Sequence, residues 1–433
     1  MARAKKETAL TPEERLQAAL VPDWEWPYKL PENWCWLKLV ESFDNHTDSK
    51  KKIKQKDYLV KGKLAVVDQG QELIGGYTND VEKSYSGALP IVIFGDHTRC
   101  IKFVDFPFAQ GADGVKVLRP KPFYLPKAFY YALQSVNIPN LGYRRHFPLF
   151  NKFSIPLPPF AEQQRIVDRI ESLFAKLDEA KEKAQAVVDS FETRKAAILH
   201  KAFTGELTAK WREEHDVRMD SWKVRTLDSV CSSIFDGDHM PPPKAESGIP
   251  FLVISNVNTG HLTFENTRFV PQEYYDTLSD TRKPQLGDVL YTLVGSFGIP
   301  VVVNSKRPFC FQRHMALLRP IDVSPQFLWY ILQTPEMYDK ASSIATGTAQ
   351  LTVPIKGLRA MTIPRPNIAE QIEIVRILDG FFAREQSAKE AAEAVLDQIN
   401  LMKKSILARA FRGELGTNDP NEESAVELLK QII

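Results

Sequence analysis

Cysteine is scarce in this chain of 433 residues, with only four residues that lie far apart and form no CxxC pair: Cys35, Cys100, Cys231 and Cys310. This spacing excludes the common zinc modules and is typical of reduced thiols in a cytosol. The sequence has no apolar run of about 18 residues and no signal peptide. We therefore expect a cytoplasmic protein that does not span a membrane. The net charge is only +2, so any nucleic-acid binding must depend on local basic patches.

Motifs of enzymatic chemistry are also missing. The sequence contains no GxxxxGK[ST] phosphate loop and no Asn-Pro-Pro-aromatic motif of adenine methyltransferases. Two loops place a carboxylate beside an imidazole, Gly95-Asp96-His97 and Gly237-Asp238-His239-Met240. Neither loop has a further His or Cys nearby at ligand spacing, so we interpret both as ordinary turns or DNA-facing polar loops. We expect no catalytic residue, no metal site and no cofactor site in this chain.

One stretch of the sequence occurs twice, at residues 155–207 and 363–415. Both copies begin with Ile-Pro, continue through Ala161-Glu162-Gln163 or Ala369-Glu370-Gln371, and end in Gly-Glu-Leu. The offset is 208 throughout, and 25 of the 53 paired positions are identical. Identity of this extent without a gap identifies an internal repeat.

Each copy predicts a long helix, because prolines precede it, apolar residues recur at steps of four and three, and a glycine follows its end. A helix of about 40 residues is about 60 Å long, and its apolar stripe needs a partner. Each stripe has a polar interruption, at Arg194 and at Glu385. We expect the copies to pair as an antiparallel coiled coil. The alternative is that each helix packs only on its own globular neighbour.

The remaining segments predict two related globular α/β domains. Strand-like runs at 64–67 and 89–94 are bounded by Gly, Asp and Asn, and a helix is expected around residues 129–133. Trp34 and Trp222 stand at matching places, at an offset of 188. The Leu-Arg-Pro sequences at 118–120 and 318–320 also match, at an offset of 200. The growing offset indicates longer early loops in the second domain.

The predicted fold class is α+β, with two globular α/β domains separated by two long antiparallel coiled-coil helices and related by a pseudo-two-fold axis. Short helices are expected in both tails, one capped by Thr11 and one around 422–432, and the sequence does not decide whether the two pack together. The predicted boundaries are 1–30 for the N-terminal tail, 31–154 for the first globe, 155–215 for the first long helix, 221–362 for the second globe, 363–416 for the second long helix and 417–433 for the C-terminal tail helix.

The two long helices keep similar sequences, whereas the two globes have diverged. This difference indicates that the globes recognise different targets while the helices have the same structural role. Duplex DNA has a near-two-fold axis and a repeat of about 34 Å per turn. A rigid protein with two recognition domains therefore suits a DNA site that is divided into two halves. Protein–protein bridging suits the same geometry, and the basic run at 50–56 favours DNA.

These residues resemble a known family. The sequence Pro-Leu-Pro-Pro-Phe-Ala-Glu-Gln-Gln-Arg-Ile-Val at 156–167, the Ala-Glu-Gln at 369–371 and the helix endings at 202–207 and 410–415 resemble the DNA specificity (S) subunits of type I restriction–modification systems. The segment 287–298 is similar to a strand–turn of their target-recognition domains. The resemblance covers nearly the whole chain. It implies two target-recognition domains, each reading one half of a bipartite site, and helices that act as spacer and as docking site for modification subunits.

The resemblance also implies partners and cofactors outside this chain. The expected partners are double-stranded DNA, two modification (methyltransferase) subunits and restriction (translocase/nuclease) subunits. S-adenosylmethionine, ATP and Mg are expected on these partner subunits, and the modification is DNA methylation on adenine. The chain itself is expected to be a non-catalytic specificity subunit.

Candidate DNA-binding residues lie in polar loops of both globes. The basic run at 50–56 suits phosphate contacts, with a solvated loop as the alternative. The loop before the first helix carries Arg and the corresponding loop of the second globe carries Gln, which favour guanine and adenine respectively. The candidates are Lys50, Lys51, Lys52, Lys54, Lys56, His97, Arg99, Tyr143, Arg144, Arg145, Asn256, Asn258, Arg282, Lys283, Arg313, His314, Thr346, Thr348 and Gln350.

Two other classes of function stay open. A stand-alone sequence-specific nuclease or methyltransferase would act by itself with Mg²⁺ or S-adenosylmethionine. A coiled-coil scaffold that joins two proteins would show no salt-dependent binding to DNA.

Overall fold

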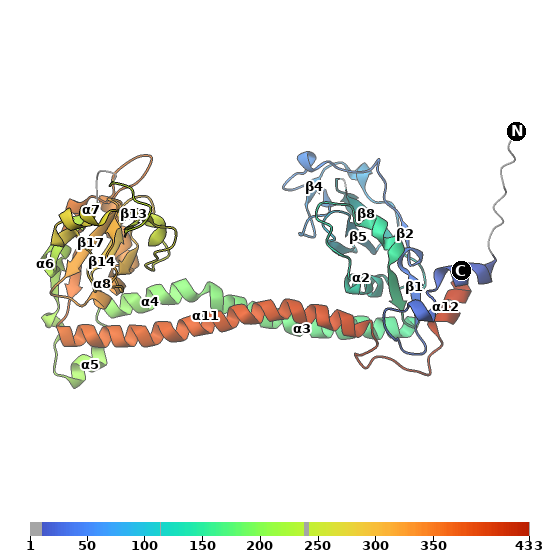
Figure 1. The fold of residues 1–433 in the computed structure, drawn as a ribbon. Helices are drawn as coiled ribbons and strands as arrows, with labels where there is room; N and C mark the ends of the chain where they lie inside the picture. Colours follow the sequence, from blue (N-terminus) through green and yellow to red (C-terminus); the bar gives the residue numbers. More distant parts are fainter. Residues whose placement is uncertain (1–10, 113, 238–241, 433) are drawn as a thin grey trace. The chain divides into compact units, whose positions relative to one another are not determined.

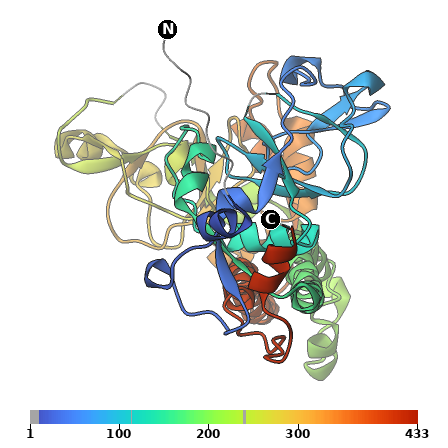
Figure 2. The same ribbon diagram turned by 90° about the vertical axis from the view of Figure 1, so that its right-hand side faces the viewer.

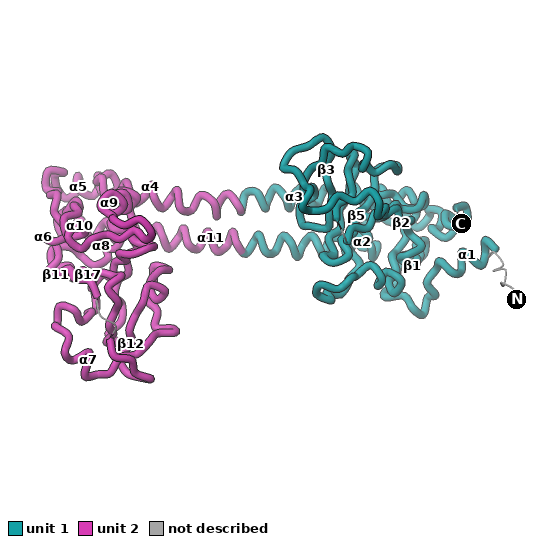
Figure 3. The backbone as a smooth tube through the Cα atoms, turned by 90° about the horizontal axis from the view of Figure 1, so that it is seen from above, with its two compact units in different colours: residues 1–184, 394–433 teal, residues 185–393 magenta. Residues whose placement is uncertain are grey.

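The structure is a computed structural model that describes residues 11–112, 114–237 and 242–432. It divides into two compact units, which Figure 3 distinguishes by colour. Unit 1 comprises Met1–Ala184 and Ala394–Ile433, and unit 2 comprises Gln185–Glu393. Each unit contains one globe and one stretch of paired helices. Within the described ranges, no helix combines the length and the apolar character needed to cross a membrane.

Short strands and short helices form the two globes, and longer helices follow each globe along the chain (Figure 1). The α-helices are α1 (Pro12–Ala19), α2 (Pro126–Ser135), α3 (Phe160–Asp189), α4 (Phe191–Phe203), α5 (Ala209–Glu214), α6 (Leu227–Val230), α7 (Gln272–Thr277), α8 (Pro325–Ile331), α9 (Pro335–Ile344), α10 (Ile355–Ala360), α11 (Ile368–Ala410) and α12 (Ala425–Ile432). The strands are β1 (Cys35–Lys38), β2 (Phe43–Asn45), β3 (Leu64–Val67), β4 (Gly76–Thr78), β5 (Ile91–Gly95), β6 (Ile101–Val104), β7 (Phe108–Gln110), β8 (Val115–Pro120), β9 (Ser154–Leu157), β10 (Lys223–Thr226), β11 (Cys231–Asp236), β12 (Ile249–Leu252), β13 (Arg268–Val270), β14 (Val289–Thr292), β15 (Pro300–Val302), β16 (Cys310–Phe311), β17 (Met315–Pro320) and β18 (Thr362–Arg365).

The two globes have the same strand order. The four-stranded sheet β2-β8-β5-β6 of unit 1 corresponds to β11-β17-β14-β15 of unit 2, and the three-stranded sheet β4-β3-β7 corresponds to β13-β12-β16. In both three-stranded sheets the central strand pairs antiparallel with one neighbour and parallel with the other. A two-stranded sheet, β1-β9 or β10-β18, completes each unit. The predicted repeat of the globes is therefore confirmed at the level of topology.

The central strands are buried on both faces, as their continuous apolar sequences predict. Alternate residues of a strand point to opposite faces, so Val92 and Phe94 of β5 join the cluster around α2, while Ile91 and Ile93 join a second cluster. Strand β14 of unit 2 divides its side chains between two clusters in the same way. Each globe thus has one core between sheet and helix and another on the opposite face of the sheet.

The long helices pair antiparallel within each unit. In unit 1 the start of α3 packs against the end of α11, with Ile166, Ile170 and Leu407 in one buried cluster. In unit 2 the end of α4 packs against the start of α11, with Leu199 and Ile374 in one cluster. The predicted antiparallel pairing is confirmed, and each pair also packs on its globe, so both packing modes occur together.

The first long helix differs from the expectation of one continuous element. Strand β9 precedes α3, which ends at Asp189, and α4 starts at Phe191. Ser190 Oγ donates to the carbonyl oxygen of Ala186 at 2.5 Å, and such bonding four residues back bends helices. Helix α11 has Gln398 at the matching position and runs without interruption. Glycine ends both copies as predicted, with φ of +83° at Gly205 and +74° at Gly413.

Both tails are helical and pack on unit 1. Thr11 and Glu14 form the capping box of α1. Ala19 of α1 and Leu429 of α12 lie in the same buried cluster, and Figures 1 and 2 both show the red α12 beside the blue α1. The two tail helices therefore contact each other, which the sequence alone did not decide.

Candidate nucleic-acid interface

A joint formed by the Glu-Gln pair of the repeated motif connects each globe to its helices. In unit 1, the buried carboxylate of Glu162 accepts hydrogen bonds from Trp34 Nε1 at 2.7 Å and from Thr417 Oγ1 at 3.1 Å. Burial raises the pKa of Glu162, and the two donors oppose that effect. Gln163 Oε1 accepts from the backbone N of Leu125, which precedes α2, at 2.7 Å. The pair therefore ties the helix to the start of β1 and to α2.

Unit 2 repeats this joint with its own residues. The buried carboxylate of Glu370 accepts from Trp222 Nε1 at 2.8 Å and from Arg212 Nη1 at 2.6 Å. Gln371 Oε1 accepts from the backbone N of Ser324, the N-cap of α8, at 2.9 Å. The identity of the Ala-Glu-Gln sequence in both copies thus has a structural cause, because the motif orients each globe on its helix.

The basic run at 50–56 forms an ordered loop between β2 and β3. The buried Ile53 donates its backbone N–H to Gln110 O at 2.9 Å, which fixes the loop to β7. Lys51 Nζ donates to the backbone carbonyl of Ser84 at 3.1 Å. Lys50, Lys54 and Lys56 are exposed, whereas Lys51 and Lys52 are half-buried. The loop is anchored and not merely solvated, while its contact with DNA stays a prediction.

The structure brings together the candidates His97 and Tyr143. Their rings stack with centroids 4.9 Å apart and an interplanar angle of 17°, and His97 Nδ1 lies 3.1 Å from the carbonyl oxygen of Tyr143. Tyr143 is 87% exposed, and the exposed Arg144 and Arg145 follow it. This aromatic pair with two adjacent guanidinium groups forms a polar, cationic corner of the first globe.

Asp96 and Arg99, in the same loop, have structural contacts. The buried Asp96 accepts hydrogen bonds on Oδ1 from the backbone N of His146 at 2.9 Å and of Phe147 at 2.7 Å. Arg99 Nη1 donates to Ile138 O at 3.0 Å. The interpretation of Gly95-Asp96-His97 as a turn therefore fits the geometry, and Asp96 positions the segment that follows Tyr143.

The second Gly-Asp-His sequence, Gly237-Asp238-His239-Met240, stands at a place in its globe that does not correspond to Gly95-Asp96-His97, and apart from Gly237 it lies outside the described residues. Within the described ranges, no group of three or more His, Cys, Asp and Glu side chains is placed to hold a metal ion.

In unit 2 the structure brings together the hairpin 346–352, the turn after β14 and His314. Backbone hydrogen bonds of 2.9 and 2.8 Å between Thr346 and Thr352 close the hairpin. Gly295 N donates to Leu351 O at 3.0 Å, and Leu293 N donates to His314 O at 2.8 Å. The candidates on this surface are Arg313, His314, Thr346, Thr348 and Gln350, of which only His314 is half-buried and the others are exposed.

The four remaining candidates of unit 2 have different positions. Asn256 is 2% exposed, and its amide is used within its own loop, accepting from Val253 N at 3.0 Å and donating to Glu265 O at 3.0 Å. This buried position does not suit a base contact, because the oxygen and the nitrogen of the amide already make hydrogen bonds within their own loop. Asn258 is exposed two residues later.

Arg282 and Lys283 lie at the end of the short 3-10 helix Asp280–Arg282. Lys283 Nζ is 3.8 Å from Asp280 Oδ1 and 5.3 Å from the ring centroid of Tyr275. Lys283 therefore contacts its own turn and α7.

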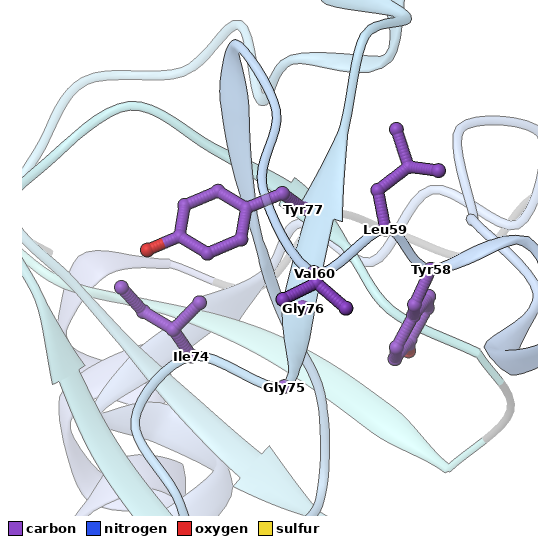
Figure 4. Close-up of a pocket in the computed structure, with 7 residues that line it drawn as sticks. All are labelled: Tyr58, Leu59, Val60, Ile74, Gly75, Gly76 and Tyr77. Atoms are coloured by element: carbon purple, nitrogen blue, oxygen red, sulfur yellow. The ribbon is translucent and has the colours of Figure 1, made fainter.

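Sequence reasoning missed a hollow at one edge of the first globe. A hollow of about 410 Å³ is lined by residues that Figure 4 labels: Tyr58, Leu59, Val60, Ile74, Gly75, Gly76 and Tyr77. Leu59 and Tyr77 exchange backbone hydrogen bonds of 2.8 and 2.9 Å, and Val60 is 91% exposed. No sequence pattern predicts this edge, since strand pairing alone brings the two segments together.

Known proteins resemble the chain in sequence. It is 28% identical over 305 residues to the type I restriction enzyme EcoKI specificity subunit of Escherichia coli (strain K12), which covers 65% of this chain and 64% of that subunit. It is also 28% identical over 304 residues to the EcoBI specificity subunit of Escherichia coli, covering 64% of this chain and 63% of the relative. The chain thus spans slightly less than two thirds of the length of these relatives.

Solved structures resemble its fold. A structure that describes complex assembly and conformational transition of the type I R-M system has a TM-score of 0.64 at 21% identity, with 90% of this chain and 100% of that chain covered. The HsdS subunit from Thermoanaerobacter tengcongensis has a TM-score of 0.56 at 20% identity, with coverage of 90% and 99%. The sequence profile described as type I restriction modification DNA specificity domain matches residues 31–188 and 219–396. The chain therefore belongs to the family of type I restriction modification DNA specificity domains.

Proposed function

We propose that this chain is the DNA specificity subunit of a type I restriction–modification complex and that each globe reads one half of a bipartite site. The observation that carries the proposal is the pair of globes with one topology, one joint and different loops. A common frame that presents two different polar surfaces suits recognition of two different half-sites. The family supports this function, because its members are named for DNA specificity.

The stacked His97 and Tyr143 with Arg144 and Arg145 form the candidate reading surface of the first globe. The hairpin 346–352 with Arg313 forms that of the second globe. Guanidinium groups pair with guanine and carboxamides with adenine in the major groove, so the two surfaces favour different bases. The basic loop at 50–56 adds phosphate contacts that carry no sequence information.

In this proposal the chain supplies recognition and geometry, and its partners supply the chemistry in the cytoplasm. The long helices act as spacer and as docking site for two modification subunits, which bind S-adenosylmethionine and methylate adenine. Restriction subunits add ATP-dependent translocation and Mg-dependent cleavage. The chain itself is non-catalytic.

The test is to map methylated bases in genomic DNA of cells that contain the modification subunit, with and without this chain. We expect chain-dependent N6-methyladenine at one bipartite motif of fixed spacing. Unchanged methylation would contradict the proposal. Nuclease or methyltransferase activity of the purified chain alone, with Mg²⁺ or S-adenosylmethionine, would contradict the non-catalytic role.

A further inference from the structure

The loop 139–145 of the first globe carries Tyr143 and the two arginines that follow it, and every residue in it is exposed. A tight turn shapes the loop, because Gly142 N donates to Asn140 Oδ1 at 3.0 Å and Gly142 has a φ of +66°. Exposed side chains contribute little apolar packing. The position of the loop therefore depends on its polar and ring contacts.

His146, which directly follows this loop, is 0% exposed. Leu141 N donates to His146 Nε2 at 3.1 Å, and His146 Nδ1 lies 2.9 Å from Asp96 O. A backbone N–H is always a donor, so Nε2 is the acceptor of the first bond. The ring proton is therefore on Nδ1, which donates it to Asp96 O. These two contacts define His146 as a neutral imidazole in one tautomer.

The same residue connects the loop to the turn between β5 and β6. Asp96 O also accepts from His146 N at 2.8 Å, so the backbone and the side chain of His146 both bond to this turn. On the exposed side, the ring of His97 stacks on Tyr143. The turn thus contacts the loop at two places, through buried His146 and through His97. Since Tyr143 follows Leu141 by two residues, the bond from Leu141 to His146 constrains the position of the exposed ring.

A protonated His146 is incompatible with this arrangement. An imidazolium has a proton on both nitrogens and accepts no hydrogen bond, so its Nε2–H would face the N–H of Leu141. A buried charge without a partner also costs free energy. The closed loop therefore excludes the second proton, and its closure becomes less favourable as pH falls.

The charged and titratable groups near His146 come from the turn, from β8 and from the loop. Asp96 Oδ1 already accepts from the backbone N of His146 and of Phe147, and Asp96 Oδ2 lies 4.0 Å from Lys116 Nζ. This carboxylate is thus used by other donors. The remaining groups are His97, Arg99, Tyr143 and Arg145.

We propose that His146 is a positioning residue of the first reading surface, and that only its neutral Nδ1–H tautomer holds the loop 139–145 in the conformation that reads DNA. The reading of DNA rests on the proposed function, whereas the order of the loop rests on the contacts of His146. A guanidinium recognises guanine through two hydrogen bonds of about 2.9 Å. A displaced loop therefore loses base discrimination even where phosphate contacts maintain affinity.

The first test follows the loop of the full chain without DNA. Labelling of histidine with ¹⁵N reports the protonation of each ring nitrogen, and His146→Gln identifies the His146 signals by their loss. We expect a proton on Nδ1 and none on Nε2 at about pH 8, where imidazoles are neutral. Hydrogen-exchange mass spectrometry then compares peptides of the loop at about pH 8 and about pH 5, with the unfolded chain as reference at each pH. The parent should lose about five- to tenfold of its protection at low pH, as the loss of one hydrogen bond predicts.

Two variants and a control separate His146 from other titrating groups. His146→Gln offers a carboxamide oxygen to Leu141 N and does not titrate, so its protection should be equal at both pH values. His97→Phe removes the other imidazole of this corner and should still lose protection as the parent does. His261→Gln, in an exposed loop of the second globe, is the matched control and should behave as the parent.

The second test measures base discrimination. Duplexes carry the bipartite site found by methylation mapping, with one base pair changed in one half at a time. The ratio of the affinities for the unchanged and the changed duplex cancels a general gain of affinity at low pH. For the half-site that depends on Arg144, this ratio should fall about tenfold from about pH 8 to about pH 5, as the loss of one base contact predicts. The ratio for the other half-site should stay constant, and in His146→Gln neither ratio should depend on pH.

Four results would contradict the proposal in distinguishable ways. A proton on His146 Nε2 at high pH, or loop protection that is independent of pH in the parent, would overturn it. Equal pH dependence in the parent and in His146→Gln would assign the effect to another group and overturn it as well. Loss of protection with unchanged discrimination would reject the role in reading. A parent chain that binds no duplex would reject the proposed function, while the exchange result would still decide whether His146 orders the loop.

Discussion

Arg194 and Glu385 form an ion pair across the two helices of unit 2, with Arg194 Nη2 and Glu385 Oε2 2.7 Å apart. These residues are the polar interruptions of the two apolar stripes. Each interruption is therefore the partner of the other, and Arg194 also donates to Val187 O at 3.2 Å. The repeat places Met402 and Leu177 at the matching positions of unit 1. A polar pair at the stripe positions of one half, opposite apolar residues in the other half, favours a single register and orientation, as polar core residues do in coiled coils.

The first prediction concerns this ion pair. Arg194→Leu or Glu385→Leu alone should destabilise unit 2 by about 1–3 kcal/mol, because the remaining charge loses its partner in a half-buried position. The double variant should recover most of this loss. A double-mutant cycle by urea unfolding measures the coupling. The more exposed pair Asp178 and Lys403 is the control, for which we expect a coupling of about 0.2–1 kcal/mol. Equal couplings for both pairs would contradict a special role of Arg194 and Glu385.

The second prediction concerns the joints. Trp34→Phe should destabilise unit 1, and Trp222→Phe should destabilise unit 2, each by about 1–3 kcal/mol, because a buried carboxylate loses one donor. Hydrogen-exchange mass spectrometry should show the loss of protection in the altered unit. Trp24→Phe is a matched control, since Trp24 is 84% exposed. Loss of protection of equal size in that control would show that the bond to the glutamate is not the cause.

The third prediction concerns pH. The raised pKa of Glu162 means that folded unit 1 holds a proton that the unfolded chain has released, in the window that starts at the ordinary value of 4.5 and extends upward. Parent stability should therefore fall as pH rises through this window, relative to Glu162→Gln, which does not titrate. Unfolding followed by the ¹⁹F signal of 5-fluorotryptophan at Trp34 reports on this unit. A parent chain that gains stability over the variant as pH rises would show that hydrogen bonding outweighs burial.

The fourth prediction concerns the spacer role. Removal of residues 180–186 together with 393–399 deletes one heptad from each helix and keeps the apolar phase. Seven residues shorten a helix by about 10.5 Å, so the gap in the recognised site should shorten by about three base pairs at about 3.4 Å each. Methylation mapping measures the gap. Methylation at the original spacing would refute the spacer role, and a four-residue deletion, which breaks the phase, is the control.

The fifth prediction separates the two reading surfaces. Gln350→Ala should relax one base of one half-site, and Arg144→Ala should relax one base of the other half-site, each by about 1–3 kcal/mol of discrimination. Methylation mapping of both variants shows which half changes. Asn256→Ala should affect folding and not base preference, since that amide caps a buried loop. A change of both halves in one variant would contradict independent reading.

The sequence predicts the parts of this fold that depend on local pattern or on the repeat. The apolar period predicts α11, the Thr11 N-cap predicts α1, and Gly205 and Gly413 predict the ends of the two helix copies. The interruption between α3 and α4 at Ser190 could not be predicted from the apolar period, because it depends on the hydrogen bond from the Ser190 hydroxyl to Ala186 O. The repeat shows that Glu162 and Glu370 are identical positions of the two copies. Their hydrogen bonds could not be predicted, because their tryptophan partners lie more than a hundred residues away along the chain.

The candidate site was less predictable for the same physical reason. Charge and loop position indicated the run at 50–56 and the hairpin 346–352. The stacking of His97 on Tyr143 could not be predicted, because 46 residues separate the two rings along the chain. Asn256 shows a different limit of the sequence pattern, because a polar residue that suggested recognition is buried and makes its hydrogen bonds inside its own turn.

The strand pairs β1-β9 and β10-β18 have a consequence for inheritance. Cys35 lies opposite Leu157, and Lys223 lies opposite Arg365, so the chain enters and leaves each globe at adjacent strands, about 4.8 Å apart. A globe is therefore an insert between two neighbouring points, held by Glu-Gln contacts that are alike in both units. Genetic recombination that replaces the coding segment of one globe would keep the helices and the joint. On the proposed function, a single crossover event at each end would then give a descendant that recognises a new half-site with the same helices.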